Sequence, residues 1–283
     1  MVFDFILGLG VIAVGILGYM VWESYRYNFD QQSVVLERLP ASFDQTHILF
    51  ISDIHRRSIS NEIIAQCKAA GKTDLVLIGG DLREKGVAIA RSRDNIRKLM
   101  TIAPVYMVYG NHDYDENIRP LEVMLQEERV GLLINQAVVL EQKDGSRIRL
   151  VGVDDPRTKR DNLKLAISEP ADGNELFTIL LAHDPVIALR RDEIKSIDLI
   201  LCGHTHGGQV CLPFIGPISR GPLEKVYWRG WFDLGTKLTT EAWSPRLFVS
   251  CGFGTSKLSI RLLAPAQFHR ITLRSSAVKA QHR

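Results

Sequence analysis

The stretch HILFISDIH, residues 47–55, decides the fold class of this chain. Its apolar part, HILFIS, has the length and composition of a buried β-strand, and polar residues follow it directly. The same pattern returns in LVLIGGD at 75–81 and in VYMVYGNHD at 105–113. Helical patterns at 61–70 and 87–100 separate these strands. The alternation predicts parallel strands covered by helices.

The rest of the chain extends this α/β pattern. Residues 117–129 are expected to form a third helix, and residues 132–155 a β-hairpin with Asp144-Gly145 at its turn. No internal repeat, low-complexity tract or linker divides the sequence, which predicts a single α/β domain. Later strands are expected at 177–183, 199–204, 247–252 and 267–273.

Polar clusters follow five of the predicted strands. Because ligands bind outside the carboxyl ends of strands in open α/β sheets, these clusters are expected to meet in one site. Five of the eight histidines of the chain lie in them, and a scatter of structural histidines would rarely divide in this way. The clusters are Asp53-Ile54-His55, Gly80-Asp81, Gly110-Asn111-His112-Asp113, His183 and Gly203-His204-Thr205-His206.

The residue types in these clusters indicate a metal centre. Carboxylates and imidazoles suit manganese, iron or zinc, and the absence of clustered thiolates argues against a structural zinc site. The ligands are too many for one ion. Two ions about 3.5–4 Å apart need a bridging carboxylate, and Asp81 is the expected bridge. Such a pair activates a bridging hydroxide and stabilises both the attacking and the leaving oxygen at phosphorus.

The motifs DIH, GGD, GNHD, the isolated His183 and GHTH, in this order, resemble the calcineurin-like metallophosphoesterase superfamily from about residue 47 to residue 274. The segments GHTHGGQV (203–210), VGVDD (151–155) and GFGTSKLSIRL (252–262) are similar to a bacterial subgroup of membrane-associated or exported phosphoesterases, some of which hydrolyse UDP-2,3-diacylglucosamine. The resemblance implies a sandwich of two facing mixed β-sheets flanked by helices.

The resemblance also implies two divalent metal ions per chain, with Mn²⁺ as the expected ion and Fe or Zn as alternatives. His112 would stabilise the phosphoryl oxygens or protonate the leaving oxygen, and Asp113 would orient its ring. Arg56 and Arg57 depart from the small or apolar pair of many relatives, so they are expected either to contact the substrate phosphate or to be solvated. One ion would be held by Asp53, His55, Asp81 and His206, and the other by Asp81, Asn111, His183 and His204.

The expected function is hydrolysis of a phosphodiester or pyrophosphate bond by a hydroxide that bridges the two ions. The expected partner is a phosphate-ester substrate, and a lipid-linked compound such as UDP-2,3-diacylglucosamine is one candidate for it. A nuclease or cyclic-nucleotide phosphodiesterase with the same site is one alternative, but a net charge of +3 gives no reason to expect nucleic acid. A non-catalytic, membrane-tethered metal-binding protein is another alternative, although every ligand position is intact.

The segment FILGLGVIAVGILGYMVW, residues 5–22, contains no charged residue and is long enough to cross a bilayer as a helix. A cleaved signal peptide is the alternative, but a basic n-region and a small-residue cleavage site are missing. Arg26 and Arg38 follow the segment, which places the catalytic domain in the cytoplasm. The expected protein is therefore single-pass in the cell membrane. Its parts are an anchor (1–25), a connector (26–46) that becomes a strand near 34–36, the catalytic domain (47–274) and a tail (275–283).

The composition, 46% hydrophobic and 24% charged over 283 residues, excludes collagen-like and wholly disordered chains. The cysteines are sparse and are expected to be unpaired thiols; they are Cys67, Cys202, Cys211 and Cys251. Residues 213–246 contain three of the four tryptophans. This stretch is interpreted either as a loop on the edge of the sandwich or as an apolar wall for an amphipathic substrate or the bilayer.

Overall fold

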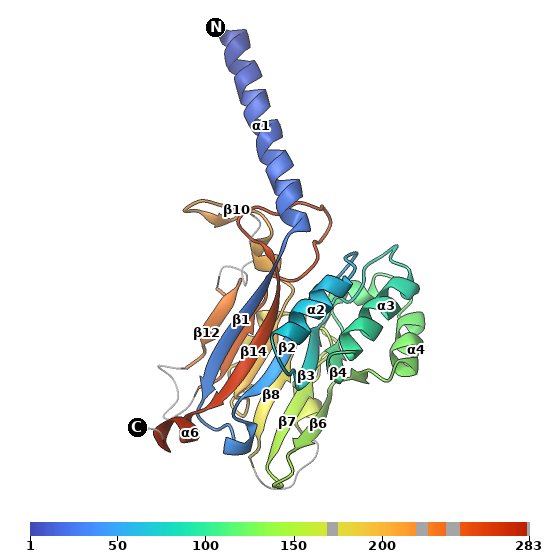
Figure 1. Ribbon diagram of the computed structural model, residues 1–283, viewed down its shortest axis with the longest axis vertical. Coiled ribbons are helices and arrows are strands. Elements are labelled where there is room, and N and C mark those ends of the chain that lie inside the picture. Colours follow the sequence, from blue (N-terminus) through green and yellow to red (C-terminus); the bar gives the residue numbers. More distant parts are fainter. Residues whose placement is uncertain (169–174, 219–225, 236–243, 282–283) are drawn as a thin grey trace.

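Two six-stranded mixed β-sheets face each other, and helices cover their outer faces (Figure 1). This arrangement, seen in a computed structural model, confirms the sandwich expected from the sequence. The structure describes residues 1–168, 175–218, 226–235 and 244–281. Trp243, one of the three tryptophans in the 213–246 stretch, lies outside the described residues.

The first sheet has the order β1-β14-β2-β3-β4-β5. The four strands from β2 to β5 are parallel to one another, and β14 runs antiparallel to β2. Its strands are β1 (Tyr27–Leu36), β2 (Thr46–Ile51), β3 (Leu75–Gly79), β4 (Val105–Val108), β5 (Gly131–Leu132) and β14 (Ala266–Ser275). Its outer face is covered by α2 (Asn61–Ala69), α3 (Ile89–Met100) and α4 (Arg119–Glu127).

The second sheet has the order β12-β13-β9-β8-β7-β6. The predicted hairpin forms its β6–β7 edge, with Gly145 in left-handed conformation at the turn (φ 81°). Its strands are β6 (Gln136–Glu141), β7 (Arg147–Gly152), β8 (Phe177–Leu181), β9 (Leu199–Cys202), β12 (Gly230–Asp233) and β13 (Arg246–Val249). Helix α5 (Leu163–Ser168) packs on its outer face.

Short elements complete the chain. A two-stranded ribbon is formed by β10 (Cys211–Leu212) and β11 (Gly216–Pro217), and α6 (Ser276–Gln281) follows β14. The 3₁₀ helices are η1 (Ala41–Phe43), η2 (Asn111–Tyr114), η3 (Pro185–Leu189) and η4 (His206–Gly208).

The central strands are apolar on both sides because both of their faces are buried. In β2, Ile48 and Phe50 pack between the two sheets, whereas Leu49 and Ile51 pack against the helices. This alternation places successive side chains on opposite faces of the sheet. A rigid, fully buried strand therefore ends at the polar cluster that begins with Asp53.

The segment expected as a connector contains a full strand of the first sheet. Strand β1 starts at Tyr27, well before the expected 34–36, and pairs in parallel with β14 along its whole length. The stacked rings of Phe29 and Phe268, with centroids 4.7 Å apart, show why the early residues join the sheet. The full length of β1 was not predicted because its pairing partner, β14, lies at the other end of the sequence.

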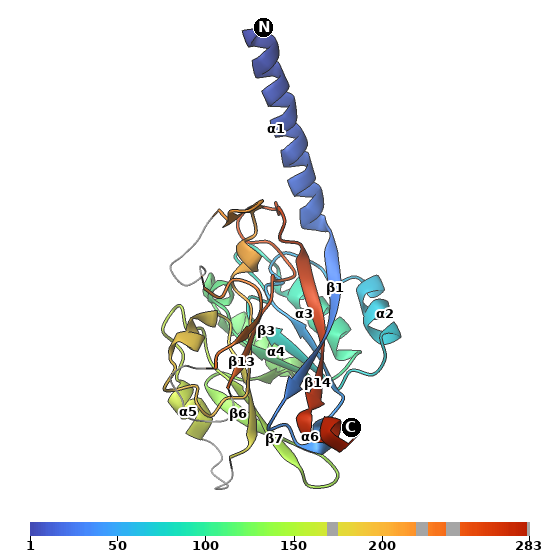
Figure 2. The same ribbon diagram turned by 90° about the vertical axis from the view of Figure 1, so that its left-hand side faces the viewer.

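Helix α1 (Val2–Tyr25) projects away from the sandwich in both views (Figures 1 and 2). Among the described helices it is the one that is long and apolar enough to cross a membrane, and that part is wholly exposed. Its last turns contact the domain through Arg261 N–H, which donates to Met20 O (3.0 Å), and Ser24 Oγ, which donates to Ser259 O (2.9 Å). The end of this helix therefore has a defined position on the domain.

Candidate metal centre

The five polar clusters meet at the carboxyl ends of the central strands, as predicted. The ligand atoms of Asp53, His55 and His206 all lie within 4.8 Å of one another, and so do those of Asp53, Asp81 and His183. All five side chains are buried. The loops after β2, β3, β8 and β9 therefore form two adjoining groups of metal-ligand type from residues more than 150 positions apart.

Asp81 lies between the two groups. Its Oδ2 is 3.6 Å from His55 Nε2 and 3.3 Å from His183 Nε2. This oxygen is buried and has no hydrogen-bond partner among the described residues, although a buried carboxylate oxygen normally accepts at least one hydrogen bond. A cation between these groups would satisfy it.

The imidazoles face each other in pairs. His55 Nε2 lies 3.1 Å from His206 Nε2, and His183 Nε2 lies 3.1 Å from His204 Nδ1. When both rings are neutral, two ring nitrogens that point at each other can each offer a lone pair to a shared cation. The Oδ1 of Asn111, the remaining expected ligand, is also buried and without a partner among the described residues. The donor set therefore fits divalent metal.

The backbone is strained where it presents these ligands. Five of the expected ligands have a left-handed backbone, with φ between 50° and 69°, a conformation that costs non-glycine residues free energy and persists where the surroundings enforce it. The chain also comes close to the ligands: a Cβ on Gly110 would lie 2.2 Å from Asp81 Oδ1, and one on Gly203 would lie 2.4 Å from Asp53 Oδ2. The five strained ligands are Asp53, His55, Asp81, His204 and His206.

The electrostatics of the site are mixed. Burial raises the pKa of Asp53, and although burial alone would lower the pKa of His183, the carboxylate of Asp81 raises it. Asp81 and His206 are shifted in the opposite directions. Burial alone would raise the pKa of Asp81, but the neighbouring His183 and His55 hold that pKa below its ordinary value. Burial, together with the positive charges of His55 and Arg261, lowers the pKa of His206 well below its ordinary value. An anionic carboxylate and a neutral imidazole are the forms that bind metal.

A second layer of residues orients the ligand imidazoles. His183 Nδ1 lies 2.8 Å from Gly79 O, and His55 Nδ1 lies 3.2 Å from the carboxylate of Glu84. Nη2 of the fully buried Arg261 lies 3.5 Å from His206 Nδ1. Such contacts fix which ring nitrogen faces the metal. The sequence reasoning missed Glu84 and Arg261, because both lie outside the strand-end motifs.

His112 lies at the edge of the site, with its ring centroid 5.1 Å from that of His55. Its Nδ1 is 2.7 Å from Asp115 Oδ2, so Asp115 orients this ring and the prediction for Asp113 was wrong. Asp113 is fully buried and accepts instead from the backbone N–H groups of Asp81 and Gly110, both at 2.9 Å. Asp113 thus holds together the loops that follow β3 and β4, and its carboxylate does not contact the ring of His112.

The two arginines after His55 differ. Arg57 was wrongly expected to contact substrate or solvent: its guanidinium donates to Phe253 O (2.8 Å), to Arg26 O (3.3 Å) and to Tyr25 O. It therefore joins the end of α1 to the domain. Arg56 is exposed and forms an ion pair with Glu84, so it remains at the edge of the site.

A groove of about 300 Å³ adjoins His206. One wall is formed by residues of the 205–210 segment, and the other by residues of the 256–260 segment. Leu258, Ile260 and Val210 give it apolar surface. Neither group of metal-ligand type found among the described residues contains a cysteine, and all four cysteines are buried free thiols.

The comparison with known families decides the identity. The model of the calcineurin-like phosphoesterase family matches residues 46–208, which include all the expected ligands. The chain belongs to this family. As a calcineurin-like phosphoesterase it is a metal-dependent phosphoester hydrolase.

Several bacterial proteins are similar to this phosphoesterase. The uncharacterized protein YpbG of Bacillus subtilis is 36% identical over 80% of both chains. The uncharacterized metallophosphoesterase YkuE of the same organism is 28% identical over 94% of this chain and 95% of its own. Phosphodiesterase YaeI of Escherichia coli is 33% identical over 65% of this chain and 68% of its own.

Solved structures confirm the fold. NAD nucleotidase of Haemophilus influenzae superposes with a TM-score of 0.52 at 14% identity, covering 74% of this chain and 45% of that one. The 5'-nucleotidase precursor of Thermus thermophilus gives 0.51 at 15% identity, covering 80% of this chain and 54% of that one. The chain thus spans about half the length of each, and at this identity the likeness concerns the fold alone.

Proposed function

We propose that this protein is a membrane-anchored phosphoesterase that uses two divalent metal ions, with Mn²⁺ preferred, to hydrolyse a phosphodiester or pyrophosphate bond in a lipid-linked substrate such as UDP-2,3-diacylglucosamine. The observation that carries the two-ion part is the position of Asp81 Oδ2, which lies between His55 and His183 and lacks a hydrogen-bond partner among the described residues. Asp53 also belongs to both ligand groups, but both of its oxygens already accept from His204 N–H at 3.1 Å. Asp81 is therefore the proposed bridge.

The residues of the chain would divide the work as follows. Asp53, His55, Asp81 and His206 would hold one ion, and Asp81, Asn111, His183 and His204 the other. Two bound ions supply activated water and neutralise charge at phosphorus. His112 would donate a proton to the leaving oxygen through Nε2, because Asp115 occupies its Nδ1. Arg56 remains the proposed contact for a substrate phosphate.

The position of α1 supports the lipid-linked substrate. Tyr27 is paired with Ala266 of β14, and β14 runs back along β2 so that this end lies beyond Phe50, level with Asp53. The apolar helix therefore leaves the domain at the edge where the metal site lies. With α1 in the membrane and the domain on the cytoplasmic side, the site would face the lipid headgroups.

The test uses the full-length protein in detergent micelles with added Mn²⁺. Metal analysis should find two ions per chain, and Asp81→Asn should serve as the inactive control. The value of kcat/KM for UDP-2,3-diacylglucosamine should exceed that for UDP-N-acetylglucosamine by about 100-fold, because acyl chains contribute binding energy. One ion per chain would disprove the two-ion centre, and equal rates on both substrates would disprove the lipid preference.

A further inference from the structure

We propose that an apolar rim beside the metal site rests on a lipid bilayer with anionic headgroups and forms a second membrane contact next to α1. The rim consists of the exposed apolar side chains of the β10–β11 segment and of the loop that precedes β14. The proposal rests on the membrane anchoring in the proposed function, but it concerns a different part of the chain. The rim residues are Leu212, Phe214, Ile215, Ile218, Leu258 and Leu263.

Exposure is the first observation. Phe214 is as exposed as in an extended chain, at 109%, while Leu258 is 64% and Ile218 61% exposed. Single exposed apolar residues are ordinary on soluble proteins, but a group of large ones at one end indicates a binding surface. An aromatic ring and aliphatic side chains at the tip of a short ribbon are suited to insertion among lipid headgroups and upper acyl chains.

Hydrogen bonds connect the rim directly to the end of α1. Cys211, the first residue of β10, donates its N–H to Leu262 O (2.8 Å). The residues on either side of Leu262 contact the helix: Arg261 N–H donates to Met20 O (3.0 Å), and Leu263 N–H donates to Glu23 Oε2 (3.2 Å). Both ribbon views place this ribbon near the base of α1 (Figures 1 and 2). The rim therefore lies at the depth where the apolar helix leaves the membrane.

Basic side chains accompany the apolar ones. Arg26 lies over the Trp22 ring, 4.6 Å from its centroid, and Arg229 donates to Leu263 O (2.9 Å). Lys257 is exposed next to Leu258. A basic and aromatic border around apolar side chains matches the anionic surface of a membrane, where each cation near the headgroups adds to binding.

The rim also borders the groove beside His206. Leu258 lines that groove, and the opposite wall continues from Val210 into β10. A bilayer on the rim would thus lie beside the groove, which is also lined by the expected ligand His206. A lipid could present its phosphate to the site while its acyl chains stay in the leaflet. A second copy of the chain fits less well, because α1 projects from the same end.

The experiment measures the depth of the rim in full-length protein reconstituted into vesicles of phosphatidylcholine and phosphatidylglycerol. All four native cysteines are buried, so Phe214→Cys adds an accessible thiol for an environment-sensitive fluorophore. Lys143→Cys, in the exposed β6–β7 turn at the other end of the domain, is the matched control. Lipids that carry a nitroxide on the acyl chain should quench the label at 214 several-fold more strongly than the label at 143.

Two results would overturn the proposal. In the first, iodide quenches the label at 214 as strongly as the label at 143, and nitroxide lipid does not quench the label at 214. This result would show that the rim lies in water. A label in an apolar environment that neither reagent quenches would show that protein covers the rim, as in a dimer.

An activity measurement separates this proposal from the proposed function. The double variant Phe214→Asp/Ile218→Asp should lower turnover of vesicle-embedded substrate about 10-fold and leave hydrolysis of bis(p-nitrophenyl) phosphate unchanged. Leu165→Asp, at an exposed leucine of α5, controls for added charge. If nitroxide lipid quenches the label at 214 but no lipid-linked substrate is turned over, the proposed function is rejected and the membrane contact of the rim is retained. Turnover of lipid substrate that the double variant does not lower would reject the rim alone.

Discussion

Asp81 and Asp198 are buried carboxylates at opposite ends of the sandwich, and their surroundings differ in every respect. Asp81 follows β3 at the carboxyl edge, has a left-handed backbone (φ 52°) and has one oxygen without a partner among the described residues. Asp198 precedes β9, and both of its oxygens have partners: Thr178 N–H donates to Oδ2 (2.8 Å), and the Arg38 guanidinium lies 3.4 Å from Oδ1.

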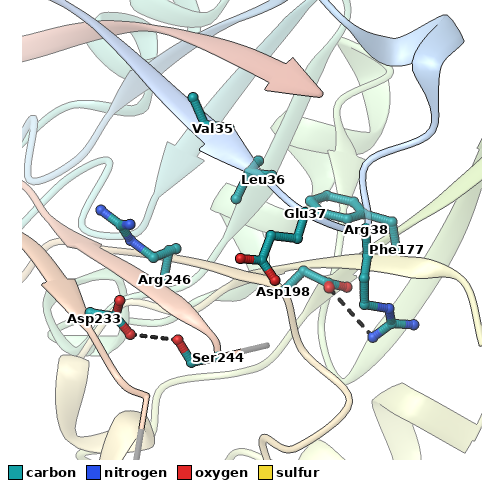
Figure 3. Close-up of a pocket in the computed structure, with 9 residues that line it drawn as sticks. All are labelled: Val35, Leu36, Glu37, Arg38, Phe177, Asp198, Asp233, Ser244 and Arg246. Carbon is teal, nitrogen blue, oxygen red and sulfur yellow. Dashed lines mark hydrogen bonds and ion pairs between the residues drawn. The ribbon is translucent and has the colours of Figure 1, made fainter. Parts of the chain in front are cut away.

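Asp198 lines a small pocket together with eight other residues (Figure 3). It measures about 70 Å³, and none of its nine lining residues has a left-handed backbone. Asp198 pairs with Arg38, and Ser244 donates to Asp233 across the same space. The comparison teaches that burial of a carboxylate does not identify a site. A left-handed backbone and a carboxylate oxygen without a partner among the described residues indicate a ligand at one edge. The paired carboxylate of Asp198 at the other edge indicates a stabilising role.

The largest expected effect comes from exchanging each carboxylate for its amide. Asp81→Asn should lower kcat on bis(p-nitrophenyl) phosphate by at least about 10³-fold, because the shared anionic ligand is lost. Asp198→Asn should leave kcat within about twofold, since it lies at the far end of the sheets. Metal analysis and steady-state kinetics on both variants check this. Full metal content and activity in Asp81→Asn would contradict the assignment of Asp81 as a metal ligand, in contrast to Asp198.

Within the carboxyl edge, His112→Ala should separate chemistry from metal binding. We expect kcat to fall about 10²–10⁴-fold while the metal content stays unchanged, because a proton donor is lost and no proposed ligand changes. Alkyl esters should lose more than activated aryl esters, whose leaving groups need little protonation. Asp115→Asn should cause a smaller loss, about 10-fold, since Asp115 acts through His112. Loss of the metals in His112→Ala would make His112 a ligand instead.

The sequence was sufficient for the central strands, for the helices α2 to α4 and for the grouping of the metal ligands, because each motif directly follows a strongly apolar strand. The predicted helix at 61–70, for example, is α2 at Asn61–Ala69. Parallel pairing then brings the motif ends together without further information.

Contacts between distant segments could not be predicted in this way. Asp113 and Asp115 are both close to His112 in sequence, and only the 3₁₀ turn η2 decides which one reaches its ring. Strand β1 depends on β14, 239 residues away in the register Tyr27↔Ala266. The spacing of three residues between His112 and Asp115 was a usable signal for their contact. No local sequence signal indicates which strand pairs with β1.

Asp198 also gives a pH dependence with a defined sign. Burial, partly offset by the backbone hydrogen bond from Thr178, raises its pKa from 3.8 to about 6. The folded state therefore binds this proton more tightly than the unfolded state, so the stabilisation is complete below about pH 4 and is lost as the pH rises through 6. The difference in unfolding free energy between Asp198→Asn and wild type should grow by up to about 3 kcal/mol from pH 4 to pH 7. Denaturant titrations of both proteins with EDTA check this, and a constant difference would contradict it.

The smallest expected effect is that of replacing Arg57. This residue lies at the carboxyl edge near the metal site, but its guanidinium has hydrogen-bond partners, as the carboxylate of Asp198 does at the opposite edge. Its fork-shaped guanidinium donates to the carbonyl oxygens of Tyr25, Arg26 and Phe253. A lysine keeps the charge but cannot bridge all three, so Arg57→Lys should lower stability by about 1–2 kcal/mol. Its KM for bis(p-nitrophenyl) phosphate should stay the same, whereas Arg56→Lys should leave stability unchanged and raise KM if Arg56 contacts phosphate. Thermal unfolding in micelles and initial rates on both variants distinguish the two roles. A raised KM with unchanged stability in Arg57→Lys would return Arg57 to the substrate site and show that satisfied partners at this edge do not mark a structural residue.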